Sequence, residues 1–184
     1  MAASIKHQLF FPHPPGAVWE YLTNAELMEL WLMKSNFQPI EGHEFQFRIN
    51  PIPAFDFDGV IYCKVLEIVP YKKLSYSWQL GPGDGSINVD SVVHWELQPT
   101  DKGTELLLHH GDFIILKNIG IFDAMNKGWL ENMHKILNRL NETNHATKHQ
   151  APISFPSSAG GSLGIPHQRA VDGTMADEKR FSAN

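Results

Sequence analysis

The clearest hydrophobic pattern of the chain lies between residues 121 and 142. Six apolar side chains recur there at steps of three and four residues, which is the spacing of one face of an amphipathic helix. They are Phe122, Met125, Trp129, Met133, Ile136 and Leu140. Charged and amide side chains occupy the opposite side. The pattern therefore predicts a long helix whose apolar face is buried against another layer of the protein.

Upstream of this helix, apolar and polar residues alternate in short runs, which is typical of strands that are buried on one side. Pro-rich and Gly-rich turns separate most of the runs. Successive strands joined by short turns favour an antiparallel sheet, and the long helix is the natural cover for one of its faces. The predicted strands cover residues 4–11, 45–49, 59–69, 74–78, 93–97 and 104–110.

Two short helices are predicted between the first two strands. Pro15 suits the first turn of one helix, because its missing N–H needs no partner there. Asn24 suits the N-cap of the next. We therefore predict an α+β fold in which a sheet of about six or seven strands is covered by the long C-terminal helix.

Composition changes after this helix. Residues 150–184 are rich in Pro, Gly and Ser and show no sustained apolar period, which is typical of disorder. A chain of 184 residues with 42% apolar residues can form one domain with a substantial core. We predict one domain over residues 1–145 and a disordered tail over residues 146–184.

The charge pattern and the single cysteine exclude several classes of function. The net charge is −5 and no basic run is present, so no nucleic-acid partner is expected. Cys63 is the only cysteine, which excludes a disulfide framework. No stretch approaches the roughly 20 apolar residues of a membrane span, so we expect a cytoplasmic protein without a membrane partner.

Ten histidines invite a metal hypothesis, but their spacing gives no closed ligand set. His109 and His110 point to opposite faces of one strand and cannot chelate one ion together. We therefore predict no metal and no cofactor. His110 shares the inner face with apolar residues, where it is a candidate acid–base group. The alternative is that His110 bonds to the backbone or to a neighbour such as Tyr76; if it is locked away from any cavity, a catalytic role fails.

Aromatic side chains are abundant on the predicted inner faces. They can fill a core, since protein interiors pack tightly, or line a mostly apolar pocket with a few polar anchors. Buried Tyr and Trp groups need a hydrogen-bond partner from protein, water or ligand. The candidate ligand-binding residues are Trp31, Phe47, Tyr62, Tyr76, Trp78, Trp95, His110, Phe113, Met125, Trp129 and Met133. Gly128, at the edge of the helix stripe, either lets the helix approach the sheet or leaves space beside it.

Four motifs in order resemble the activator of heat-shock-protein ATPase homologue-like family of the START-like, helix-grip superfamily. They are AVWEYLTNAELMELWL, GVIYCKVLEIVPYKKLSYSW, VVHWELQPTDKGTELLLHHGDF and GWLENMHKIL. The resemblance covers residues 5–142. It implies a curved antiparallel sheet that grips the long helix, with a cavity for an apolar small molecule between the two layers.

The resemblance implies no particular reaction, because the superfamily includes carriers, receptors and cyclases. Our first hypothesis is a module that binds an apolar or amphipathic small molecule, as a monomer or weak homodimer. The second is an enzyme of cyclase or dehydratase type that uses the same cavity. The third is a chaperone-associated interaction module, although the first strand begins near Ser4 and we expect no additional chaperone-binding domain before it.

Overall fold

The structure is a computed structural model that describes residues 4–114 and 119–148. Six strands form one curved sheet in the order β1-β6-β5-β4-β3-β2, and all neighbouring strands are antiparallel. The strands from β2 to β6 follow one another directly, whereas β1 pairs with the last strand. Their bounds are β1 Ile5–Phe11, β2 Glu44–Arg48, β3 Val60–Val69, β4 Lys73–Leu80, β5 Val89–Thr100 and β6 Gly103–Gly111. The predicted α+β class is confirmed.

The two short helices begin where the sequence places their start signals. Pro15 opens α1 (Pro15–Thr23), and the Asn24 side chain caps α2 (Ala25–Glu29) by accepting bonds from two backbone N–H groups. A short 3₁₀ helix, η1 (Pro53–Phe55), lies in the segment between β2 and β3. The long helix is α3 (Ile119–Lys148), which extends beyond the predicted residues 121–142. From residue 149 onward, the predicted tail lies outside the described residues.

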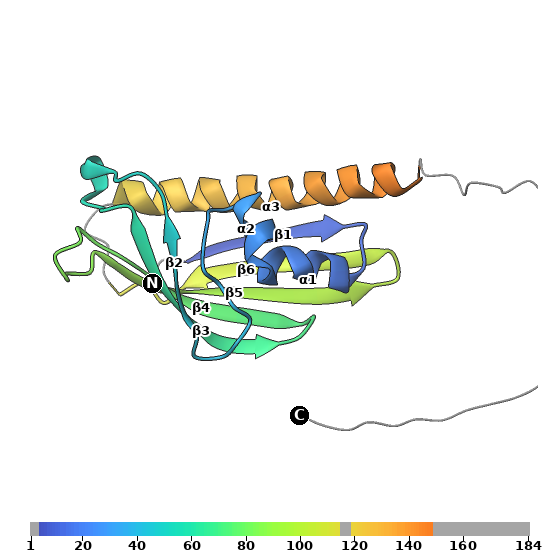
Figure 1. The fold of residues 1–184 in the computed structure, drawn as a ribbon, viewed down its shortest axis with the longest axis horizontal. Helices are drawn as coiled ribbons and strands as arrows, with labels where there is room; N and C mark the ends of the chain where they lie inside the picture. Colours follow the sequence, from blue (N-terminus) through green and yellow to red (C-terminus); the bar gives the residue numbers. More distant parts are fainter. Residues whose placement is uncertain (1–3, 115–118, 149–184) are drawn as a thin grey trace, which may run out of the picture. The chain divides into compact units, whose positions relative to one another are not determined.

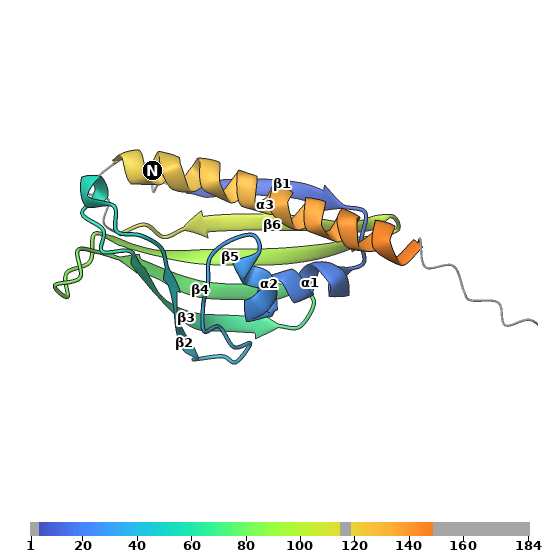
Figure 2. The same cartoon turned by 45° about the horizontal axis from the view of Figure 1, so that its top comes forward.

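The core lies between the sheet and α3, which runs along the length of the sheet (Figure 1, Figure 2). Trp129, Met133, Ile136 and Leu140 of the predicted stripe are buried, while the other two stripe residues are partly buried. On the solvent side of α3, Lys127 pairs with a glutamate one turn later. The amphipathic pattern therefore sets which side of the helix faces the sheet.

Candidate functional site

A cavity of about 260 Å³ lies under the N-terminal half of α3, and we call it the α3 cavity. One wall is formed by α3, a second by β3 and β4, and a third by the segments that follow α2 and β2. Almost every lining side chain is apolar, and Asn132 is the one amide among them. The lining residues are Leu32, Met33, Ile49, Ile52, Phe55, Phe57, Ile61, Trp78, Leu80, Ile121, Ala124, Met125, Gly128, Trp129 and Asn132.

Gly128 helps to keep the α3 cavity open. A Cβ atom built at this position would meet no heavy atom within 4 Å. The helix therefore does not use this glycine to approach the sheet. Of the two roles that the sequence leaves open for Gly128, the structure shows the second, in which the missing side chain leaves space.

A chain of hydrogen bonds connects α3 to the sheet behind the cavity. The indole N–H of Trp129 donates to Nδ1 of His110 at 2.9 Å. Because Nδ1 accepts, Nε2 of the neutral ring carries the proton and donates to the Ser91 hydroxyl at 2.8 Å. The Ser91 hydroxyl in turn donates to the backbone carbonyl of Trp78 at 3.1 Å. Both ring nitrogens of His110 are thus engaged within the protein.

His110 is fully buried and does not line the α3 cavity. Burial, with smaller contributions from His109 and His94, lowers the pKa of His110 to about 3. A ring that is neutral near pH 7 and bonded at both nitrogens has no free position for proton transfer. His110 bonds to Ser91 and Trp129 rather than to Tyr76, the neighbour that the sequence suggested.

Two inward-facing tryptophans near the cavity differ in how their indole groups are paired. Trp95 donates its N–H to the Tyr76 hydroxyl at 3.1 Å. Trp78 is only 4% exposed, and its Nε1 has no hydrogen-bond partner among the described residues. A buried donor without a partner costs stability, so the Trp78 N–H is a group that a bound molecule can satisfy.

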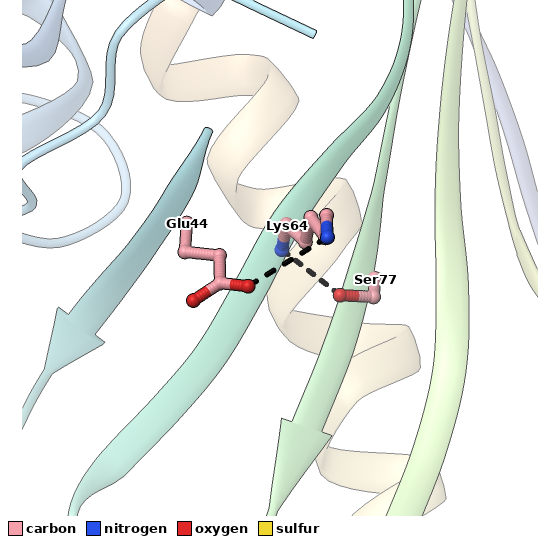
Figure 3. Close-up of polar contacts among 3 residues, drawn as sticks. All are labelled: Glu44, Lys64 and Ser77. Carbon is pink, nitrogen blue, oxygen red and sulfur yellow. Dashed lines mark hydrogen bonds and ion pairs between the residues drawn. The ribbon is translucent and has the colours of Figure 1, made fainter. Parts of the chain in front are cut away.

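A larger groove of about 960 Å³ lies against the opposite face of the sheet, over β2, β3 and β4. In Figure 3, Lys64 lies between its two partners there. Its ammonium is 3.7 Å from Glu44, and its backbone N–H donates to the Ser77 hydroxyl at 2.9 Å. Both charged side chains are more than half exposed, and such pairs contribute little free energy. Polar and charged side chains make up most of the groove, whereas the α3 cavity is almost entirely apolar, so the α3 cavity is the stronger candidate for a small-molecule site.

The structure brings only part of the predicted ligand-binding set to the α3 cavity. Trp78, Met125 and Trp129 line it. Tyr62 lies in the groove on the opposite face and is 45% exposed. Phe113 packs on His110, with ring centroids 4.7 Å apart. The remaining six, His110 included, are buried in the core outside the cavity lining: Trp31, Phe47, Tyr76, Trp95, His110 and Met133.

Some of the cavity residues that sequence reasoning missed lie between β2 and β3. Ile52, Phe55 and Phe57 come from a segment whose prolines indicate a turn, so we did not assign them to a wall. Ile49 ends the predicted strand over residues 45–49, but we did not include it among the candidate ligand-binding residues. The available signal was the density of large apolar residues in that turn, because an exposed loop does not need three of them.

The histidine and cysteine side chains supply no metal centre in the described part of the chain, where no three His, Cys, Asp or Glu residues converge. Cys63 is buried, and burial raises the pKa of its thiol, which makes the reactive thiolate unfavourable.

Within the described residues, no helix is both long and apolar enough to span a membrane.

Comparison with known proteins places this geometry in a family. A family model described as Activator of Hsp90 ATPase homolog 1-like protein matches residues 12–144. A solved protein from Mesorhizobium loti is 31% identical, with a TM-score of 0.67 over 77% of this chain and 98% of its own. No curated protein matches.

Two more distant solved structures show the same fold. A Bacillus halodurans protein is 22% identical, with a TM-score of 0.59 over 76% of this chain and 99% of its own. The Aha1 dimer from Colwellia psychrerythraea is 17% identical, with a TM-score of 0.60 over 75% of this chain and 96% of its own.

Proposed function

This chain belongs to the Activator of Hsp90 ATPase homolog 1-like family, and we propose that it binds an apolar or amphipathic small molecule in the α3 cavity. The START-like fold of its relatives is consistent with a ligand-binding domain. The observation that carries the proposal is the apolar lining around Gly128, where a missing side chain leaves space between α3 and the sheet.

The volume of the α3 cavity limits the size of the ligand that it can hold. An engineered apolar cavity of about 150 Å³ stays dry and binds benzene, so about 260 Å³ suits a molecule of one or two rings. Apolar side chains that line an open pocket remain in contact with water, which is unfavourable. A ligand that fills the space displaces this water, which supports binding as the reason for the cavity.

The cyclase or dehydratase alternative requires an acid–base group at the cavity. His110 was its candidate, but both of its ring nitrogens are bonded inside the protein. The geometry therefore favours a binding module over this enzyme. The dimeric relative from Colwellia psychrerythraea is compatible with our proposal that the protein is a monomer or weak homodimer.

Substitutions of Gly128 test the site directly. We expect Gly128→Leu to abolish binding of ethylnaphthalene, a two-ring apolar probe, because the new side chain occupies the cavity. Gly128→Ala is the matched control: it should keep most of the binding and raise the free energy of unfolding by about 0.5–1 kcal/mol through its better helix propensity. Isothermal titration calorimetry and urea unfolding measure the two effects. If the Gly128→Leu variant is folded and still binds ethylnaphthalene as tightly as the wild type, the probe binds outside the α3 cavity.

Trp78→Phe tests the unpaired indole N–H. Wild-type protein should bind acetylnaphthalene about 3–10 times more tightly than ethylnaphthalene, because the ketone can accept the Trp78 N–H. We expect Trp78→Phe to lose this preference. Trp95→Phe, which removes a similar volume but an N–H already paired with Tyr76, should keep it. Titrations with both probes measure the ratio, and an unchanged ratio in Trp78→Phe would exclude this donor.

A further inference from the structure

A second, smaller hollow of about 190 Å³ adjoins the α3 cavity, and we call it the Asn88 recess. It lies between η1, the residue that follows η1, and the start of β5. The two hollows share Phe55 and Ile121 as wall residues, so they are neighbours. The other residues around the recess are Pro53, Ala54, Asp56, Asn88 and Val89.

The Asn88 side chain has an oxygen that the protein leaves without a partner. Asn88 is only 3% exposed, and Oδ1 is one of two buried side-chain polar atoms in the described part of the chain that make no hydrogen bond. The other is Nε1 of Trp78, a residue that lines the neighbouring α3 cavity. A buried oxygen acceptor of this kind requires a donor to offset its lost hydration.

The hydrogen bonds of Nδ2 fix the orientation of the Asn88 side-chain amide. Nδ2 donates to the backbone carbonyl of Asp56 at 2.8 Å and to Oδ2 of the same residue at 3.1 Å. Turning the amide over would place Oδ1 against these two oxygens, which are both acceptors. The unpaired atom is therefore the oxygen, and the missing group is a donor.

Asp56 adds negative charge at the same place. Its carboxylate forms no ion pair among the described residues, and no Lys, Arg or His side chain lines the recess. Asp56 has φ of 52°, in the left-handed region that Asp and Asn tolerate better than most residues. Its backbone N–H is bonded to the Pro53 carbonyl, which holds the residue at the end of η1.

We propose that the ligand is an apolar molecule with a protonated amine as its head group, which donates to Asn88 Oδ1 in the recess beside the Asp56 carboxylate. The apolar body occupies the α3 cavity. This inference rests on the proposed function, because binding of the apolar part of the ligand in the α3 cavity is what positions the head group in the adjoining Asn88 recess. An ammonium group supplies both things that the recess lacks, a hydrogen-bond donor and a positive charge.

Three naphthalene probes of similar size separate the contribution of the hydrogen bond to Asn88 from the contribution of the Asp56 charge. Ethylnaphthalene has no polar head, naphthalenemethanol has a neutral donor, and naphthylmethylamine is protonated at neutral pH. We expect the alcohol to bind about 3–10 times more tightly than the hydrocarbon through the hydrogen bond to Asn88. The amine should gain a further factor of about 2–5 from the exposed Asp56 carboxylate at low salt.

Asp56→Asn removes the charge while keeping the shape, the left-handed backbone and an acceptor for the Asn88 amide. In this variant, the advantage of the amine over the alcohol should disappear, and the alcohol should still exceed the hydrocarbon. Asp101→Asn, in the turn between β5 and β6, is the control and should leave all three affinities unchanged.

Calorimetric titration of the intact chain distinguishes the possible failures. If the hydrocarbon binds as tightly as both polar probes, the inference about the head group is overturned while the proposed function stands. An amine advantage that survives in Asp56→Asn also overturns the role of the carboxylate. If none of the three probes binds, the proposed function itself fails.

Discussion

Replacing Trp129 by alanine is expected to lower the free energy of unfolding by about 3–5 kcal/mol. The side chain is only 3% exposed. Its ring packs against Trp78 and Trp95, with centroid separations of 5.2 and 5.6 Å. The substitution also removes the donor to His110 Nδ1 and leaves a buried acceptor unpaired. Urea unfolding followed by circular dichroism measures the change.

Two controls separate the causes of this effect. Trp129→Phe keeps an aromatic ring but no N–H, so its smaller loss, about 1–3 kcal/mol, reports mainly the unpaired histidine. Leu130→Ala changes the next residue on the helix, which is 40% exposed, and should stay within about 0.5 kcal/mol of wild type. If Trp129→Ala hardly changes the free energy of unfolding, the Trp129 ring does not contribute to the stability of the core.

Stability should fall steeply in acid because of His110. Its pKa is about 6.5 in an unfolded chain and is lowered to about 3 in the fold. The unfolded state therefore binds the proton more readily, so the histidine destabilises the fold as the pH falls below about 6.5. The expected loss is about 1.4 kcal/mol per pH unit, or about 3 kcal/mol by pH 4. Urea unfolding at a series of pH values measures this slope.

His110→Gln is the reference variant, because glutamine can donate and accept but does not titrate in this range. The variant will be less stable near neutral pH, so the informative quantity is how the difference in stability changes with pH. We expect the wild type to lose its advantage between pH 6.5 and 4, while other titrating groups cancel in the subtraction. A pH-independent difference would mean that His110 accepts a proton in the folded protein.

The fold could be predicted from the sequence because its signals are local. The α3 stripe repeats every turn, Asn24 is followed by backbone N–H groups that need a cap, and alternation marks each strand. These patterns depend on neighbouring residues only. They therefore indicate which side of each element is buried, and short connections between strands indicate antiparallel pairing.

The site was predicted less well because a cavity depends on how several elements meet. Alternation correctly places Phe47, Tyr76 and Trp95 on inner faces, but it does not tell whether an inward ring fills the core or borders a void. In β3, both faces carry apolar or aromatic residues, so Tyr62 could be assigned to the inner side although it faces outward. The apolar loop before β3 forms a wall only through contacts distant in sequence.

The position of β1 at the far edge of the sheet also affects how the protein folds. Ile5 pairs with His110, so the backbone hydrogen bonds of β1 can form only after β6, the last strand of the chain, is present. The strands from β2 to β6 can pair in order as they leave the ribosome, whereas β1 and the two helices after it cannot dock until β6 and α3 have been synthesised. Closing so long a loop carries an entropic cost and slows folding. The newly made chain consequently exposes the apolar inner face of its sheet until translation has passed α3.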